Sequence, residues 1–286
     1  MSDHEKNEIV GGMLYLVATP IGNLADLSER AIKVLSEVDL IAAEDTRNSR
    51  RLLSALGIGK EMLSYHDHNR RERGEQIARR LKTGESCALI TDAGTPGISD
   101  PGEDMVALCA AENIPVTLIP GPCAAINALV LSGLPTERFV FEGFLSAKTT
   151  ERRAALAELK GEKRTVIFHE APHKLRATLA DMCEAFGEGR RIALCRELTK
   201  LNEEIIRTTL GGACELYAER EPRGEYVLVV EGAKDREEEK FFLNMTEREH
   251  VEHYISLGMS KNDAIKAAAR DRGVHKSEIY KFMIEE

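Results

Sequence analysis

The segment HEAPH at residues 169–173 matches the pattern HExxH, in which two histidines on one helix face bind zinc beside a glutamate base. It directly follows the apolar run TVIF, which predicts a strand that ends at the motif. Pro172 favours the first turn of a new helix and disfavours helical geometry at Ala171. The two histidines then belong to different elements, so we expect a loop at a sheet edge and no metal site.

Three loops rich in glycine and proline predict a cofactor pocket instead. They are ATPIGNL at residues 18–24, DAGTPGISDPG at residues 92–102 and IPGPCAA at residues 119–125, and each follows a predicted strand. Glycine lets the backbone approach a ligand, and open α/β sheets bind ligands at the carboxyl ends of parallel strands. The phosphate-binding pattern GxxxxGK[ST] and the dinucleotide pattern GxGxxG are absent from the sequence, which gives no support to ATP hydrolysis or dinucleotide binding.

Short apolar runs alternate with helical patterns over most of the chain, which predicts an α/β fold. Runs such as LYLVAT, LIAAED, CALITD and YVLVVEG are apolar at nearly every position, as in strands of a largely parallel sheet that is covered on both faces. Antiparallel strands are expected in the second half, where EEIIRTTL closely follows RIALCREL.

Changes in composition divide the chain into three expected parts. A first α/β domain is expected over residues 12–134 and ends at the segment SGLPTER, and a second is expected over residues 135–232. The charged segment KDREEEK then precedes an all-helical module over residues 241–286.

Turn and capping residues predict three short helices in this module. Gly258 ends the first helix, Ser260 with Asp263 caps the start of the second, and Gly273 ends the second. Three short helices with tight turns resemble a helix-turn-helix module.

The composition is that of a globular protein with a substantial core. The chain has 286 residues, which at ~150 residues per domain predicts more than one compact unit. No apolar run approaches the ~20 residues of a membrane-spanning helix and the N-terminus has no signal-peptide core, so we expect a cytoplasmic protein without a membrane partner. The six cysteines form no CxxC pair and mostly lie in apolar runs, which predicts reduced, buried thiols.

Several long segments resemble one enzyme family. They are LYLVATPIGNLADLSERAIKVLSEVDLIAAEDTRNSRRLL, DAGTPGISDPG, LIPGPCAAINALVLSG, FHEAPHK, RELTKLNEE and GEYVLVVEG. The chain resembles the small-subunit ribosomal RNA methyltransferase I family of the tetrapyrrole methylase superfamily. The resemblance implies two α/β domains of tetrapyrrole-methylase type with a cleft between them, S-adenosylmethionine as cofactor and a homodimer. The implied reaction is 2′-O-methylation of a cytidine ribose in the decoding region of 16S ribosomal RNA in the 30S subunit.

The resemblance also implies the cofactor contacts. In this superfamily a Gly-Asp-Pro-type loop contacts the cofactor, and Gly94, Thr95 and Pro96 take its place here. Because Thr95 replaces the acidic residue, Asp92 or Asp100 is expected to supply the polar contact. The other implied contacts are Pro20, Gly22, Ile98, Ser99, Cys123, Ala124, Phe168, Leu198 and Tyr226.

Methyl transfer to a ribose hydroxyl requires alignment of the reactants and help in removing the hydroxyl proton. The candidate bases are carboxylates on loops at the sheet edge, Glu44, Asp45 and Glu170, of which we select Asp45 or Glu170. Lys200, which follows the segment RELT, is expected to stabilise the developing oxyanion.

Basic residues are concentrated in one part of an acidic chain. The formal net charge of −9 on its own argues against a nucleic-acid partner. Residues 47–82, however, hold ten Lys or Arg against four Asp or Glu. Binding depends on the local field beside the site, so restricted basic surfaces are sufficient for RNA. The expected RNA contacts are Arg47, Arg50, Arg51, Lys261 and Lys276.

Two other functions fit parts of the sequence. A methyltransferase of a small tetrapyrrole of the precorrin type would use the same cofactor pocket, but it needs neither the helical module nor the basic stretch. A DNA-binding regulator would use a helix-turn-helix module beside a ligand-sensing α/β part. The helical module itself either binds RNA or serves in packing or dimer contacts.

Overall fold

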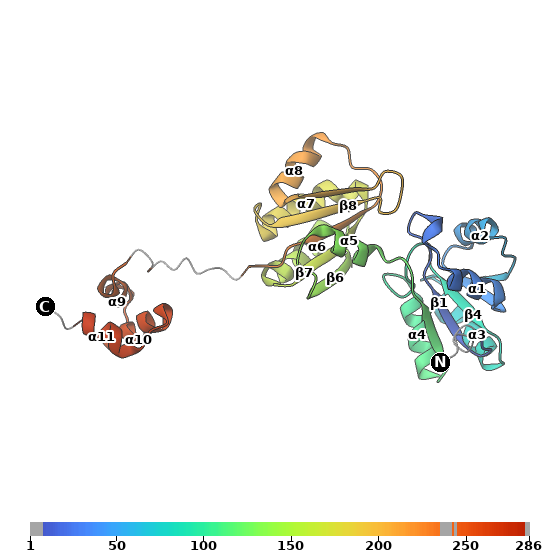
Figure 1. Cartoon of the computed structure of the whole chain (residues 1–286), viewed down its shortest axis with the longest axis horizontal. Coiled ribbons are helices and arrows are strands. Elements are labelled where there is room, and N and C mark those ends of the chain that lie inside the picture. Colours follow the sequence, from blue (N-terminus) through green and yellow to red (C-terminus); the bar gives the residue numbers. More distant parts are fainter. Residues whose placement is uncertain (1–7, 235–241, 243–244, 284–286) are drawn as a thin grey trace. The chain divides into compact units, whose positions relative to one another are not determined.

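The computed structural model describes residues 8–234, 242 and 245–283 of the chain. The chain forms two compact units, residues 1–232 and residues 233–286, which are described separately below (Figure 1). The expected start of the helical module at Phe241 lies outside the described residues, as does all of the segment KDREEEK except Lys234.

A parallel sheet forms the first half of the larger unit. Its strands are β1 (Leu14–Val17), β2 (Leu40–Ala43), β3 (Glu61–Ser64), β4 (Cys87–Ile90) and β5 (Val116–Ile119), in the order β3-β2-β4-β1-β5. All of these pairings are parallel, and β1, β2 and β4 are buried at every position. The prediction of a parallel sheet covered on both faces is confirmed for this half.

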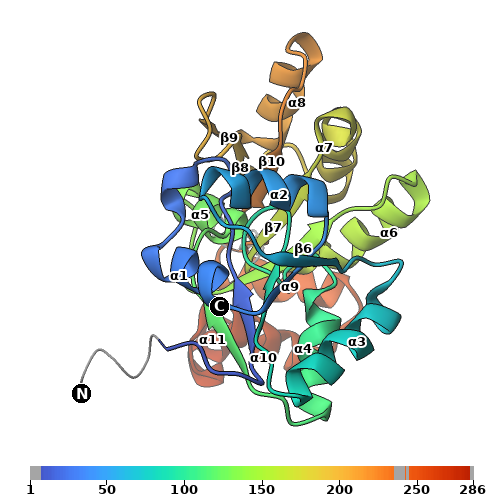
Figure 2. The same ribbon diagram turned by 90° about the vertical axis from the view of Figure 1, so that its right-hand side faces the viewer.

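Helices cover both faces of this sheet because successive strand side chains point to opposite faces. Leu14 and Leu16 pack toward α3 (Arg70–Lys82) and α4 (Gly102–Ala111), which lie side by side (Figure 2). Tyr15 and Val17 pack toward α1 and α2 on the other face. The helices of that face are α1 (Glu29–Glu37) and α2 (Thr46–Ala55), and a short 3-10 turn, η1 (Leu24–Asp26), precedes them.

The second sheet is mixed. Its strands are β6 (Phe139–Phe144), β7 (Thr165–Glu170), β8 (Arg191–Arg196), β9 (Glu204–Thr209) and β10 (Tyr226–Val230), in the order β6-β7-β10-β8-β9. The predicted antiparallel pairing of β8 with β9 is confirmed. The expectation of a largely parallel sheet is wrong here, because β10 inserts between β7 and β8 and runs antiparallel to both.

The helices of the second sheet lie on opposite faces. One face is covered by α6 (Thr149–Glu158), η2 (Leu159–Gly161), α7 (Pro172–Phe186) and α8 (Leu210–Glu219), and the other by α5 (Ala124–Ser132). Ala125, Ala128 and Leu129 of α5 pack on β7, β8 and β10. By its packing α5 therefore belongs to the second sheet, although the sequence suggested a domain boundary after residue 134.

The smaller unit contains α9 (Glu247–Ser256), α10 (Lys261–Arg272) and α11 (Lys276–Phe282). Val251, Ile265 and Ile279 form its core together with alanines of α10. The Ser260 side chain accepts a hydrogen bond from the Asp263 amide, and Gly273 ends α10 with a φ of 67°. The predicted helix boundaries in this module are confirmed.

Two further expectations concern the cysteines and membrane-spanning helices. All six cysteines are free thiols, and Cys87, Cys109 and Cys195 are buried. Among the described residues, no helix is both long enough and apolar enough to cross a membrane.

Candidate active site

A cavity of about 530 Å³ is lined by the carboxyl edge of the first sheet and one edge of the second sheet. The first sheet contributes the loops that follow β1, β4 and β5, whose strands are neighbours in the sheet. The second sheet contributes the ends of β6, β7 and β8 and the start of β10. A concave site of this volume suits a small molecule.

Hydrogen bonds tie the three loops of the first sheet together. The backbones of Thr19 and Gly94 form a reciprocal pair, with N···O distances of 2.9 and 3.1 Å. Thr95 Oγ1 donates to the Pro122 carbonyl at 3.0 Å, which joins the second loop to the third. The three glycine-rich segments, far apart in sequence, therefore form one wall of the cavity.

Asp100 organises the second loop. Its carboxylate accepts hydrogen bonds from the amides of Gly97, Ile98 and Gly102 at 2.8–3.2 Å. These bonds hold a tight turn in which Gly97 and Ser99 have φ angles of 88° and 66°. Asp100 lines the cavity, but its lone pairs are used within the loop, so it is a structural residue of the wall.

Most of the residues expected to contact the cofactor line this cavity. They are Asp92, Gly94, Thr95, Ile98, Ser99, Cys123, Ala124, Leu198 and Tyr226. Pro20, Gly22, Pro96 and Phe168 do not line it. Of the two acidic residues considered for the polar contact, Asp92 is the more available, since among the described residues its carboxylate accepts only from Asn48 Nδ2, at 3.2 Å.

Gly22 acts on the cavity through a neighbour. A Cβ at this position would lie 2.4 Å from Lys200 Cγ and 3.2 Å from the Leu198 carbonyl oxygen. Only a glycine lets the first loop pack this closely on the turn after β8. Gly22 therefore positions the residues that line the cavity and does not line it itself.

The expectation that Phe168 contacts the cofactor is wrong, because its side chain points away from the cavity. Phe168 is fully buried in the core beneath α6, α7 and α8. The next residue, His169, points to the opposite face and lines the cavity. The sequence TVIFHE is apolar on both faces of the strand, so the pattern did not indicate which face meets the ligand.

An ion-pair cluster lies at the second-sheet edge. Lys200 Nζ donates to Glu197 Oε1 at 2.9 Å and to Glu225 Oε2 at 3.0 Å. Burial disfavours the charged ammonium, but these carboxylates outweigh it and raise the pKa of Lys200. Lys200 is therefore a fixed positive charge in the cavity wall.

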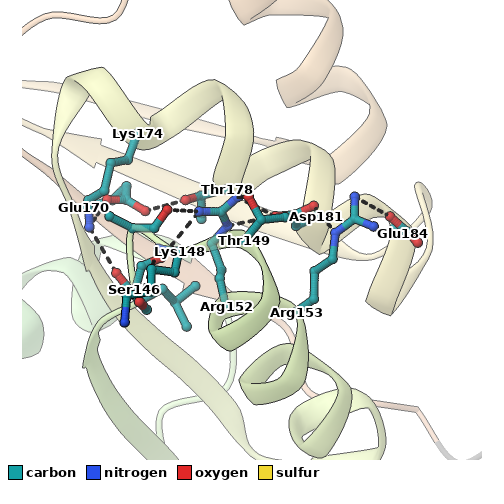
Figure 3. A network of polar contacts seen from close by, with 12 residues as sticks. Ser146, Lys148, Thr149, Arg152, Arg153, Glu170, Lys174, Thr178, Asp181 and Glu184 are labelled. Atoms are coloured by element: carbon teal, nitrogen blue, oxygen red, sulfur yellow. Dashed lines mark hydrogen bonds and ion pairs between the residues drawn. The ribbon is translucent and has the colours of Figure 1, made fainter.

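Glu170 lines the cavity but is fully engaged within the fold (Figure 3). Its side chain is 1% exposed and pairs with Lys174 Nζ at 3.0 Å. Its carboxylate also accepts from the Ala171 amide at 2.8 Å and from Thr178 Oγ1 at 2.5 Å. These bonds fix the turn between β7 and α7, so Glu170 serves as a structural carboxylate at the cavity.

An ion-pair network continues from this turn along α6 and α7 (Figure 3). Asp181 of α7 pairs with Arg152 at 2.6 Å and with Arg153 at 2.8 Å. Arg152 also donates to the carbonyls of Ser146 and Ala147, each at 3.3 Å. The network thus supports the loop that follows β6 at the cavity rim.

Asp45 and Glu44 do not line the cavity. Asp45 is the N-cap of α2, where its side chain accepts from the Arg47 amide at 2.8 Å. Hydrogen bonds from the Arg47 side chain and backbone lower the pKa of Asp45 to about 2. Glu44 accepts a hydrogen bond from Thr91 Oγ1 at 2.7 Å. The structure therefore corrects the choice of Asp45 as base, because the carboxylate is both displaced from the cavity and very weakly basic.

The HEAPH segment is divided as predicted. His169 lies near the end of β7, Pro172 is the first residue of α7, and His173 is exposed on that helix. Among the residues that the structure describes, no group of three His, Cys, Asp or Glu side chains is arranged to hold a metal ion.

The basic stretch contains both paired and unpaired cations. Arg47 is paired with Asp45, and Arg80 with Glu61 and Glu85. Arg50 and Arg51 are exposed on α2, and within the described part of the chain no ion pair engages them. In the smaller unit, Lys261 and Lys276 begin α10 and α11 and are exposed or half-buried at the surface.

Several cavity residues escaped the sequence reasoning. They are Ile21, Thr91, Ala93, Ala125, Phe144, Ala171, Pro172, Cys195, Glu225 and Val227, and His169 was considered only as a metal ligand. Most adjoin a predicted residue in sequence, so extending each loop by one or two positions would have found them. Glu225 reaches the site only because β10 pairs with β7 and β8, which the sequence does not reveal.

The fold is shared with solved methyltransferases of low sequence identity. Uroporphyrin-III-C-methyltransferase from Thermus thermophilus matches with a TM-score of 0.56 and 19% identity, covering 77% of this chain and 94% of that chain. A uroporphyrin-III C-methyl transferase from the same organism, complexed with S-adenyl homocysteine, matches with a TM-score of 0.53 and 17% identity and covers 77% and 97% of the two chains.

Sequence comparison gives a closer relationship. The model of the Tetrapyrrole (Corrin/Porphyrin) Methylases matches residues 13–214. Ribosomal RNA small subunit methyltransferase I of Halalkalibacterium halodurans is 48% identical and covers 96% of each chain. The proteins of that name from Bacillus subtilis and Escherichia coli O157:H7 are 46% and 42% identical, cover 98% and 100% of this chain, and are covered over 96% and 99% of their own length. The chain therefore belongs to the ribosomal RNA small subunit methyltransferase I family of the tetrapyrrole methylases.

Proposed function

We propose that the chain transfers a methyl group from S-adenosylmethionine to the ribose 2′-oxygen of a cytidine in the decoding region of 16S ribosomal RNA, within the 30S subunit. The observation that carries this proposal is the similarity, over 96–100% of this chain, to relatives named ribosomal RNA small subunit methyltransferase I. A substrate of this kind places the reaction in the cytoplasm.

The cavity fits S-adenosylmethionine in size and in lining. Its volume is about 530 Å³, and its wall combines apolar side chains with polar groups on glycine-containing loops. Gly94 has a φ of 86° and brings backbone to the cavity without a Cβ. The residues that would hold the cofactor are Asp92, Gly94, Thr95, Ile98, Ser99, Cys123, Ala124, Leu198 and Tyr226. When bound, the cofactor supplies an electrophilic methyl group.

Lys200 is the group that we assign to charge stabilisation at the reacting hydroxyl. Its ammonium is held at the cavity by Glu197 and Glu225. A fixed positive charge beside the ribose stabilises the negative charge that develops on the 2′-oxygen as its proton leaves. Glu170, which is ion-paired and hydrogen-bonded, is assigned to positioning of the cavity wall.

We assign RNA binding to two basic surfaces. The first is the exposed face of α2, which carries Arg47, Arg50 and Arg51. This helix follows β2, the neighbour of β4 in the first sheet. The second is the helical module with Lys261 and Lys276. Each cation that neutralises a phosphate adds to the salt dependence of binding. Deletion of the chain from about residue 241 should weaken binding to the 30S subunit and leave cofactor binding intact, whereas unchanged binding would assign the module to packing.

A second copy of the chain is the partner that we assign to an exposed apolar surface on α5 and β6. Val130 is 68% exposed, and Ile126 and Phe139, which line one shallow groove, are 42% and 39% exposed. A contiguous apolar surface of this kind is typical of an interface. Light scattering should find a dimer, and Val130→Glu should give a monomer. A monomeric wild-type protein at assay concentration would contradict this assignment.

A small-tetrapyrrole methyltransferase is the second candidate, because solved proteins with this fold are named uroporphyrin-III and cobalt precorrin-4 methyltransferases. A DNA-binding regulator is the third, because of the helical module. Radiolabelled S-adenosylmethionine incubated with 30S subunits, free 16S RNA, a precorrin-type substrate or no acceptor separates them. We expect label in the RNA of 30S subunits. Label in the precorrin supports the second candidate, and operator binding without any methyl transfer supports the third.

A further inference from the structure

His169 is an unexplained polar group in the cavity. It lies near the end of β7, where its ring packs edge-on against Phe141 and Phe144 with centroid distances of 5.1 and 5.2 Å. Its Nε2 is buried and has no hydrogen-bond partner among the described residues. Buried polar atoms without a partner are rare because they are costly. Because Nε2 is closed off by its surroundings while the ring lines the cavity, a ligand group would meet the ring at Nδ1, which also forms no hydrogen bond with the described residues.

The carboxylates that line the cavity are already occupied. Glu170 is ion-paired with Lys174, and Asp100 accepts three backbone hydrogen bonds. Asp92 accepts from Asn48, and Glu225 is paired with Lys200. Of the imidazole and carboxylate groups among the described residues that line the cavity, His169 alone forms no hydrogen bond with the protein.

The surroundings of His169 favour the neutral form of its imidazole. Burial lowers its pKa below the ordinary value, and the charge of Glu225 opposes this shift only in part. The other charged groups at the site are Glu170 on β7, Lys200 on the turn after β8 and Lys174 on α7, whose Nζ lies 5.5 Å from the Phe144 ring centroid. A neutral imidazole without a protein partner is a competent proton acceptor at neutral pH.

We propose that His169 is the general base of the methyl transfer, an inference that rests on the proposed function. The imidazole takes the proton of the ribose 2′-hydroxyl while the 2′-oxygen bonds to the methyl carbon. The bond between that carbon and the sulfonium sulfur breaks, and its electron pair stays on sulfur. The imidazolium then releases the proton to solvent. His169 near the end of β7 and Lys200 on the turn after β8 both line the cavity, and in this proposal they act on the same hydroxyl.

The test compares two histidines of the same HEAPH segment. His169→Gln keeps a polar side chain but cannot accept a proton, and His173→Gln changes the exposed histidine on α7, which does not line the cavity. Single-turnover methyl transfer to 30S subunits is measured at saturating cofactor from pH 5 to pH 9, cofactor affinity by calorimetry, and folding by thermal unfolding. His169→Ala is assayed with and without added imidazole.

We expect His169→Gln to transfer methyl groups about 100- to 10,000-fold more slowly, with a cofactor Kd within about threefold of wild type. The wild-type rate should fall as the pH drops below the pKa of His169, and this limb should vanish in His169→Gln and persist in His173→Gln. Added imidazole should partly restore His169→Ala. A folded His169→Gln enzyme with the wild-type rate and pH profile, or one that loses only cofactor affinity, would overturn the inference. Absence of transfer by the wild-type protein would instead refute the proposed function.

Discussion

The two edges that form the cavity are built differently. The first-sheet edge is mostly backbone, with glycine- and proline-rich loops tied together by hydrogen bonds such as the Thr19–Gly94 pair. The second-sheet edge carries the ionisable side chains His169, Glu170 and Lys200. The difference indicates a division of work in which the first edge shapes the cofactor site and the second edge acts on the hydroxyl. Substitutions that alter the backbone of the first edge should therefore lower cofactor affinity, and substitutions that remove charge from the second edge should lower the rate of methyl transfer.

After His169→Gln, the largest expected effect comes from removing the charge at the second edge. Lys200→Met should lower the single-turnover rate about 100- to 1,000-fold, because a fixed charge at the reacting oxygen is lost and Glu197 and Glu225 remain together without it. Lys148→Met, which removes an exposed lysine also paired with a glutamate, is the control. A normal rate in Lys200→Met would show that Lys200 does not stabilise charge on the hydroxyl.

Glu170 tests whether every ionisable group at the second edge takes part in the chemistry. Glu170→Gln should lower the free energy of unfolding by about 3 kcal/mol, because it leaves the ammonium of Lys174 without its buried partner. Urea unfolding measures this loss. The pH dependence of methyl transfer should keep its wild-type form below the unfolding temperature. A variant of normal stability that lost the pH-dependent limb would identify Glu170 as the base.

At the first edge the effect should be smaller and confined to the cofactor. Gly94→Ala should weaken cofactor binding about tenfold, because a Cβ is strained at a φ of 86° and would meet Ile21 at 3.4 Å. Gly57→Ala is the matched control, since its φ is 70° and no atom lies within 4 Å of the added Cβ. Calorimetry compares the two. Equal cofactor affinities would contradict the assignment of this loop to the cofactor.

The smallest effect is expected outside both edges, on α2. Arg50→Glu with Arg51→Glu should weaken binding to 30S subunits about tenfold at low salt, with a shallower salt dependence, because phosphate contacts are lost. Arg30→Glu with Lys33→Glu, both on α1, makes the same change in net charge and is the control. Binding is measured by filter retention over a range of salt concentrations. Identical salt slopes would remove α2 from the RNA interface.

The sequence predicted the first edge better than the second, for a physical reason. Glycines and prolines after short buried strands indicate where the backbone turns, and parallel neighbours bring those turns together. The loops at residues 18–24 and 92–102 were therefore recognised as parts of one pocket, and the structure brings both to the first-sheet edge of the cavity.

Side-chain roles at the second edge depend on features that the sequence does not carry. Phe168 faces the core and its neighbour His169 faces the cavity, because successive side chains of a strand point to opposite faces. Glu225 lies beside Lys200 because β10 pairs with β8. Asp45 is a different case, because Asp before the helical segment TRNSRRLL is a typical N-cap, and this signal favoured a structural role from the start.

The position of the transferred methyl group tests the central claim most directly. 30S subunits are incubated with the protein and radiolabelled S-adenosylmethionine, and the 16S RNA is then hydrolysed in alkali. A methyl group on a ribose 2′-oxygen protects the adjacent phosphodiester, so the account predicts label in one alkali-resistant dinucleotide that begins with cytidine. Label recovered in alkali-sensitive mononucleotides, with the methyl group on a base, would contradict it.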